Sequence, residues 1–235
     1  MAEKKVSLSK KILFIVILLA IVVGAVVGAY SLFNSWKYPK LLNAQFTEIV
    51  ASNGGELFKD NAVVLEDIEI ELDDLKVLDF TPSKIVNISP NDVLGGIYIP
   101  NGNIKLPIAK GVEAEYAKSA AVTLQKDFSF EQANVVLGSH STKGKALFTG
   151  LQTLSEGDDI YVTDKNKIYY YTVTKKIRSK SGREDFMLPR NSQSLTLITG
   201  FDNEKDEQLV IQAKFVTSDT YAQETVGELF DIFGY

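Results

Sequence analysis

Two short apolar segments separated by a polar loop constrain the fold of this chain more than any other feature. Residues Leu195–Thr199 and Leu209–Ala213 are crowded with apolar and β-branched side chains, and glycine, aspartate and asparagine open the loop between them. This pattern favours two β-strands joined by a turn. Similar short segments recur from Val93 onward, with turn residues between them, as at Asn101–Asn103. Short strands with regular turn signals predict an all-β barrel or sandwich.

The N-terminal region carries an apolar run that predicts a membrane-spanning helix. Residues Ile12–Ala29 include no charged side chain, and the uncharged run continues to Trp36. A helix rises about 1.5 Å per residue, so this run can span a hydrocarbon core of about 30 Å. Lysines precede the run, and the positive-inside rule therefore predicts a cytoplasmic N-terminus and an extracytoplasmic C-terminal domain. A cleaved signal peptide is the alternative, although its apolar region usually has only about 7–15 residues.

Composition excludes several classes of site. The net charge of −5 argues against nucleic-acid binding, which depends on clusters of lysine and arginine. The chain has no cysteine, so disulfides, thiolate metal sites and a thiol nucleophile are all excluded. His140 is the single histidine, which also argues against a structural zinc site.

Acidic residues alternate with isoleucine and leucine between Glu66 and Asp74. This period of two predicts a half-buried strand with an acidic outer face. Calcium binds carboxylates, but the regular loop spacing of a dedicated calcium site is absent here. We therefore expect a solvated acidic face and no cofactor, with calcium as the alternative.

Several motifs of the C-terminal part resemble those of the sortase family, and of its class A members in particular. Thr196–Thr199 has the pattern T-L-x-T, which in sortases precedes the catalytic cysteine. The strand-like stretch from Val135 ends at His140, where the family has its catalytic histidine. Further residues match the opening strands of the sortase barrel: Gly96, Ile97, Ile99, Pro100, Leu106, Pro107, Ile108 and Gly111.

The resemblance implies a fold and a division of the chain. Residues 91–235 are expected to form a mostly β domain, a sortase-like closed β-barrel with short helices. The preceding chain divides into a cytoplasmic N-terminus over residues 1–11, a transmembrane anchor over 12–35 and a juxtamembrane extension over 36–90.

The resemblance also implies where catalysis would occur. Sortases cleave a threonine–glycine bond within an L-P-x-T-G sorting signal: a cysteine attacks, an arginine steadies the oxyanion, and a histidine protonates the leaving amine. His140 matches the histidine, but Gly200 stands at the cysteine position and Gln208 at the arginine position. Covalent catalysis requires a nucleophilic side chain, which Gly200 lacks. We therefore predict that the chain is inactive as it stands.

A peptide-binding groove is the second implication. Its expected lining consists of Ala121, Val122, Thr123, Ile198 and Thr199. The family has glycine where this chain has Val122, so the wall of the groove carries added bulk. The implied partner is the sorting-signal peptide of a surface protein or another cell-envelope protein.

Three alternatives remain open. Ser139 or Ser141 could replace the missing nucleophile, but neighbours on a strand point to opposite faces, which should separate them from His140. The chain could be an active transpeptidase inactivated by a substitution at position 200, although the second loss at Gln208 fits a natural degenerate homologue better. Finally, it could be a non-catalytic surface scaffold that does not use the groove.

Overall fold

The computed structural model describes residues 16–29, 62–78, 86–144, 146–164 and 166–220. After a helix over residues 16–29, the described chain is built from short strands and 3-10 helices. The strands are β1 (Ala62–Val64), β2 (Val77–Leu78), β3 (Val93–Ile99), β4 (Ile104–Ala109), β5 (Ala121–Thr123), β6 (Asp127–Ser129), β7 (Val135–Gly138), β8 (Ser141–Thr142), β9 (Asp159–Thr163), β10 (Lys167–Lys180), β11 (Ser194–Asp202) and β12 (Glu207–Thr220). The 3-10 helices are η1 (Leu72–Asp74), η2 (Pro90–Asp92), η3 (Ala114–Lys118), η4 (Leu147–Thr153) and η5 (Glu184–Met187).

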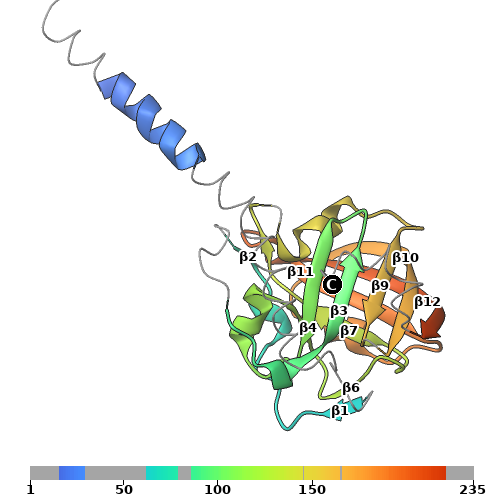
Figure 1. Cartoon of the computed structure of the whole chain (residues 1–235). Helices are drawn as coiled ribbons and strands as arrows, with labels where there is room; N and C mark the ends of the chain where they lie inside the picture. Colours follow the sequence, from blue (N-terminus) through green and yellow to red (C-terminus); the bar gives the residue numbers. More distant parts are fainter. Residues whose placement is uncertain (1–15, 30–61, 79–85, 145, 165, 221–235) are drawn as a thin grey trace, which may run out of the picture.

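Eight strands close into a barrel in the order β10-β12-β11-β7-β5-β4-β3-β9 (Figure 1). Most neighbours are antiparallel, but β11 pairs with β7 and β4 pairs with β5 in parallel. Two small sheets, β1–β6 and β2–β8, lie outside the barrel. The prediction of a mostly β closed barrel with short helices is confirmed.

Side chains of the barrel strands alternate between two apolar clusters, because successive residues of a strand point to opposite faces. On β11, Leu195 and Leu197 join the cluster inside the barrel, whereas Ile198 joins a second cluster on the outer face. The outer cluster covers β5, β7, β11 and β12 with side chains from η3, η5 and the N-terminal extension, among them Leu72 and Leu75. The N-terminal extension is therefore packed against the barrel wall.

The predicted membrane anchor falls only partly within the described residues. Residues 16–29 form a helix whose side chains are exposed, while 12–15 and 30–35 lie outside the description. No helix in the described ranges is long and apolar enough to cross a membrane. The predicted boundaries between residues 11 and 12 and between 35 and 36 also lie outside the described residues.

The strand predicted between Glu66 and Asp74 is not present. Ile70 and Leu72 are buried and Ile68 is half-buried, whereas the acidic residues between them are exposed. The predicted alternation of buried and exposed side chains is therefore present. However, no strand of the described residues pairs with it: the Glu69 N–H donates to the Gly111 carbonyl oxygen at 2.9 Å, and the Leu72 carbonyl oxygen accepts from the Gln208 side chain. The chain then turns into η1, so it remains extended but unpaired. Within the described ranges, no group of three or more acidic or histidine side chains could hold a metal ion.

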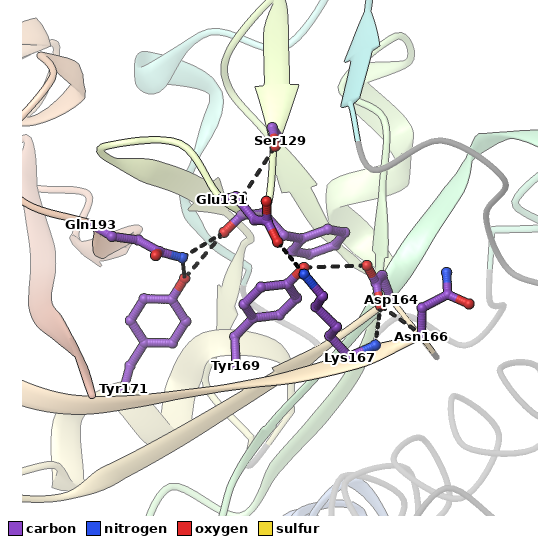
Figure 2. Close-up of polar contacts among 9 residues, drawn as sticks. Ser129, Glu131, Asp164, Asn166, Lys167, Tyr169, Tyr171 and Gln193 are labelled. Carbon is purple, nitrogen blue, oxygen red and sulfur yellow. Dashed lines mark hydrogen bonds and ion pairs between the residues drawn. The ribbon is translucent and has the colours of Figure 1, made fainter. Parts of the chain in front are cut away.

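A network of polar side chains lies around the start of β10 (Figure 2). The buried Asp164 carboxylate accepts hydrogen bonds from the backbone N–H groups of Asn166 and Lys167, at 2.8 and 2.7 Å, and the Tyr169 hydroxyl donates to it at 3.4 Å. Burial raises the pKa of Tyr171 to about 12, so this second hydroxyl is neutral. These groups lie where β10 begins. Their polar atoms are satisfied by each other, and we assign the network a structural role.

Candidate active site

The structure brings the three predicted catalytic positions together at one end of three neighbouring strands. On β11, Gly200 lies opposite Gln208 of β12 in the antiparallel ladder. On the other side of β11, Ile198 lies opposite Gly138, the last residue of β7. His140 follows two residues later. In the β10–β12 ladder, Gln208 lies beside the C-terminal end of β10. The polar network lies at the start of the same strand, so the two are at opposite ends of the barrel.

Residues 72–78, called the groove segment below, contact all three positions. The Gln208 side-chain amide donates a hydrogen bond to the Leu72 carbonyl oxygen. The Lys76 backbone N–H donates to His140 Nδ1 at 3.1 Å. The backbone of Lys76 also passes directly over Gly200. The candidate active site is therefore occupied by another part of the same chain.

Gly200 leaves no room for a side chain while the groove segment is in place. A Cβ atom built on Gly200 would lie 2.5 Å from both the Cα and the carbonyl carbon of Lys76, and 2.7 Å from the Val77 nitrogen. All three neighbours are backbone atoms, which cannot move aside by a change of rotamer. Because Gly200 has no side chain, the backbone of the segment can pass this close to β11.

The groove segment is also held beyond these three contacts. The Asn203 side-chain amide forms two hydrogen bonds with the backbone of Val77. Its oxygen accepts from the Val77 N–H at 3.0 Å, and its nitrogen donates to the Val77 carbonyl oxygen at 2.7 Å. The segment ends in β2, which pairs in parallel with β8. There the Ser141 N–H donates to the Lys76 carbonyl oxygen at 3.2 Å.

Two leucines anchor the segment in the outer apolar cluster. Leu72 is 7% exposed and Leu75 only 2%. Leu75 lies over Gly138, where a Cβ atom would come within 2.7 Å of a Leu75 methyl carbon. By contrast, the side chains of Asp73, Asp74 and Lys76 are exposed. The barrel therefore contacts the main chain of the segment and two of its apolar side chains.

His140 is not positioned for acid–base catalysis in this state. Its side chain is buried, and that burial is the main cause of a lowered pKa, to which the nearby Lys118 charge adds. The Lys76 carbonyl oxygen and the acidic Asp74 and Glu115 oppose the shift. A neutral ring protonated on Nε2 can accept the 3.1 Å hydrogen bond from Lys76, although the Lys76 carbonyl oxygen also lies 3.3 Å from Nδ1.

The nearby hydroxyl groups make no hydrogen bond to His140 among the contacts of the described residues. Ser139 donates to the carbonyl oxygens of Ala117 and Ala120, at 3.1 and 2.8 Å. Ser141 donates to the Gly200 carbonyl oxygen at 2.6 Å. A serine nucleophile needs a base within hydrogen-bond reach, so neither geometry supports a replacement nucleophile.

The five predicted groove residues divide between the two faces of the barrel wall. Val122 and Ile198 belong to the outer apolar cluster, which the groove segment covers. Ala121 belongs to the interior cluster, and strand alternation places Thr123 and Thr199 on that inner side as well. The period-two alternation of β5 and β11 was the signal that could have separated them.

Sequence reasoning missed the residues that hold the groove segment. Asn203 lies in the loop between β11 and β12, and nothing in the sequence distinguishes it from an ordinary turn residue. Two cavities, of about 310 and 180 Å³, flank the segment and share Asp73 in their lining. Neither is lined by His140, Gly200 or Gln208. Both cavities lie beside the catalytic positions and do not open onto them.

Comparison with known proteins gives a consistent result. The sortase domain family matches residues 97–216. Sortase A of Streptococcus agalactiae is 35% identical over 130 residues, which cover 52% of this chain and 52% of that protein. Sortase A of Bacillus anthracis is 25% identical over 193 residues, covering 81% of this chain and 87% of that protein. The chain thus aligns with about half of the streptococcal relative's length and most of the Bacillus one.

Solved structures show the same fold. Sortase A of Listeria monocytogenes superposes with a TM-score of 0.56 at 24% identity, covering 59% of this chain and 97% of that structure. Sortase C-3 of Streptococcus pneumoniae superposes with a TM-score of 0.54 at 15% identity, covering 82% of this chain and 92% of that structure. At these identities, the likeness concerns the fold alone.

Proposed function

The chain belongs to the sortase family, and on this premise we propose that it is a membrane-anchored, extracytoplasmic sortase-fold protein that does not catalyse transpeptidation. One observation carries the proposal. The backbone of Lys76 lies 2.5 Å from where a Cβ atom of residue 200 would be. The position that supplies the nucleophile in the family is therefore without a side chain and covered by the chain itself.

The chemistry of the other two positions supports the same proposal. An acyl-enzyme needs a nucleophile, which position 200 does not provide. Gln208 is neutral, and charge-assisted hydrogen bonds are about twice as strong as neutral ones. Its amide is moreover engaged by the Leu72 carbonyl oxygen. Loss of one oxyanion donor typically raises the barrier by about 2.7–4 kcal/mol. His140 Nδ1, in turn, is occupied by the Lys76 N–H.

The proposal predicts no transfer of a sorting signal. When the full chain is incubated with an L-P-x-T-G peptide and an amine acceptor, mass spectrometry should find neither cleavage nor transfer product above a control without protein. A catalytically active sortase serves as the positive control for the peptide and the amine. Product formed by this chain would contradict the proposal, and its loss on His140→Ala would then identify a histidine-dependent mechanism.

Membrane anchoring is the second part of the proposal and rests on the uncharged run over Ile12–Ala29 with lysines before it. In intact protoplasts, added protease should digest the C-terminal domain while the N-terminal flank stays protected. An antibody against the C-terminal tail, applied before and after lysis, measures this. Protection of the tail in sealed protoplasts would contradict the orientation.

A cell-surface scaffold is the second candidate function. It is favoured by the same groove segment, because a groove filled from within is not available to a sorting signal. In that case, the partner would bind exposed faces elsewhere on the barrel. Binding of an L-P-x-T-G peptide at the former active site would argue against the scaffold, whereas no binding there would favour it.

A further inference from the structure

We infer that the former catalytic centre has become a binding site for an extended apolar peptide, and that the groove segment is its resident occupant. The inference rests on the proposed function, because it takes the centre to be free of catalytic duties. The ligand is defined by what the segment presents: two leucines three residues apart, followed by a stretch of main chain that pairs with a strand. Gly200 and Gln208 then act as binding determinants.

Recognition of the main chain is the first argument. Three side chains at this end of the barrel, those of His140, Asn203 and Gln208, hydrogen-bond to backbone atoms of the groove segment. The parallel pairing of β2 with β8 adds the ladder contacts of an incorporated strand. Addition of an extended peptide to a sheet, with main-chain hydrogen bonds for affinity and pockets for selected side chains, is a recurring mode of peptide recognition.

Steric selection is the second argument. Two glycines of the outer face lie where the segment approaches closely: Gly200 under the backbone of Lys76, and Gly138 under the Leu75 side chain. A side chain at either position would collide with the segment. The face is thus shaped for one backbone path and one leucine. By contrast, the side chains of Asp73 and Asp74, between the two leucines, are exposed to solvent.

Occupation in cis has a measurable consequence. When a binding-competent state is only fractionally populated, the apparent affinity for a ligand falls by that fraction. The wild-type chain should therefore bind a second copy of the segment weakly, and a variant with a loosened segment should bind it well.

The test uses the full chain and a fluorescent peptide of residues 70–78, IELDDLKVL. Lys76→Pro removes the N–H group that donates to His140, and it changes no residue of the barrel. Fluorescence anisotropy should show an apparent affinity at least about tenfold higher for Lys76→Pro than for wild type. Lys76→Ala is the matched control: it keeps the N–H group, alters only an exposed side chain and should behave as wild type.

A second pair of variants tests the steric argument. Adding Gly200→Ala to Lys76→Pro should abolish binding of the 70–78 peptide, because the new Cβ atom occupies the path of the peptide backbone. Hydrogen exchange of the Val77 amide, which donates to Asn203 in wild type, reports whether the segment has been released. If Lys76→Pro leaves this amide protected, Leu75→Asp provides a stronger disruption.

The remaining outcomes contradict the inference. A released segment without binding of the 70–78 peptide would show that the face is only covered, not selective. Binding of an L-P-x-T-G peptide in place of the 70–78 peptide would show a retained sorting-signal groove. An amide that stays protected in both variants would show that neither the Lys76 hydrogen bond nor the Leu75 contact holds the segment, which removes the contacts on which the inference rests. Transfer product, by contrast, would overturn the proposed function and leave peptide binding to be judged by anisotropy.

Discussion

Replacing Gly200 with alanine is expected to lower the free energy of unfolding by about 1–3 kcal/mol, the usual cost of forcing extra atoms into a packed site. The added Cβ atom would lie 2.5 Å from the Lys76 backbone, a separation that folded proteins do not tolerate. Because β11 is paired on both sides and the groove segment is not part of the barrel, the segment should move and the barrel should remain.

Urea denaturation of the full chain measures this change, and hydrogen exchange of the Val77 amide localises it. Gly28→Ala is the control, since a Cβ atom there meets nothing within 4 Å. An unchanged free energy of unfolding, together with a protected Val77 amide, would mean that the segment does not pass over Gly200 as described.

Truncation of Leu75 to alanine should have the other large effect, a loss of up to about 2–5 kcal/mol in the free energy of unfolding. Leu75 is 2% exposed and belongs to the outer apolar cluster. Once the segment has detached, residue 75 no longer contacts the barrel. The loss in the free energy of unfolding therefore cannot exceed the free energy with which the segment docks on the barrel.

Val64→Ala is the matched control for Leu75→Ala. Val64 is also an aliphatic residue of the N-terminal extension, but it is 79% exposed. Surface substitutions of this kind usually change stability by no more than about 0.5 kcal/mol. Thermal or urea unfolding of the two variants compares them directly. Equal effects would mean that the packing of Leu75 on the barrel is wrong.

The barrel could be predicted because its signals are local. Segments such as Leu195–Thr199 combine β-branched residues with flanking turn residues, and these features decide strand formation over a few residues. The sortase-like motifs then indicated a closed barrel, whereas the order of its strands comes from the structure. The same motifs assigned His140, Gly200 and Gln208 to one candidate site, and the register of β7, β11 and β12 brings these three residues together.

Other expectations differ from the structure because they depended on tertiary contacts that a local sequence pattern does not determine. Between Glu66 and Asp74 the alternation correctly indicates one buried face, but a strand also needs a neighbour, and η1 interrupts the segment before it finds one. Among the predicted groove residues, Ala121, Thr123 and Thr199 were taken from the family resemblance as parts of continuous motifs. The pleat of β5 and β11 directs alternate side chains to the interior.

The groove segment could not be predicted at all. Its hydrogen bonds join residues that are far apart in sequence: 126 positions separate Val77 from Asn203, and 136 separate Leu72 from Gln208. Neither Asn203 nor the segment carries a motif. The sequence shows a glycine at position 200, but only the three-dimensional structure shows that the backbone of Lys76 packs against it.

The distance in sequence between the groove segment and the residues that hold it determines the order in which they are made during translation. The ribosome makes proteins at about 5–20 residues per second, so Val77 is complete about 6–25 s before Asn203 exists. During that interval the surface on which Leu72 and Leu75 pack is incomplete, because β12 has not been made, and closing so long a loop also carries an entropic cost. The groove segment is therefore the first of these parts to be translated and the last to dock. An unfinished chain would display two unprotected leucines to chaperones, to proteases and to other copies of itself.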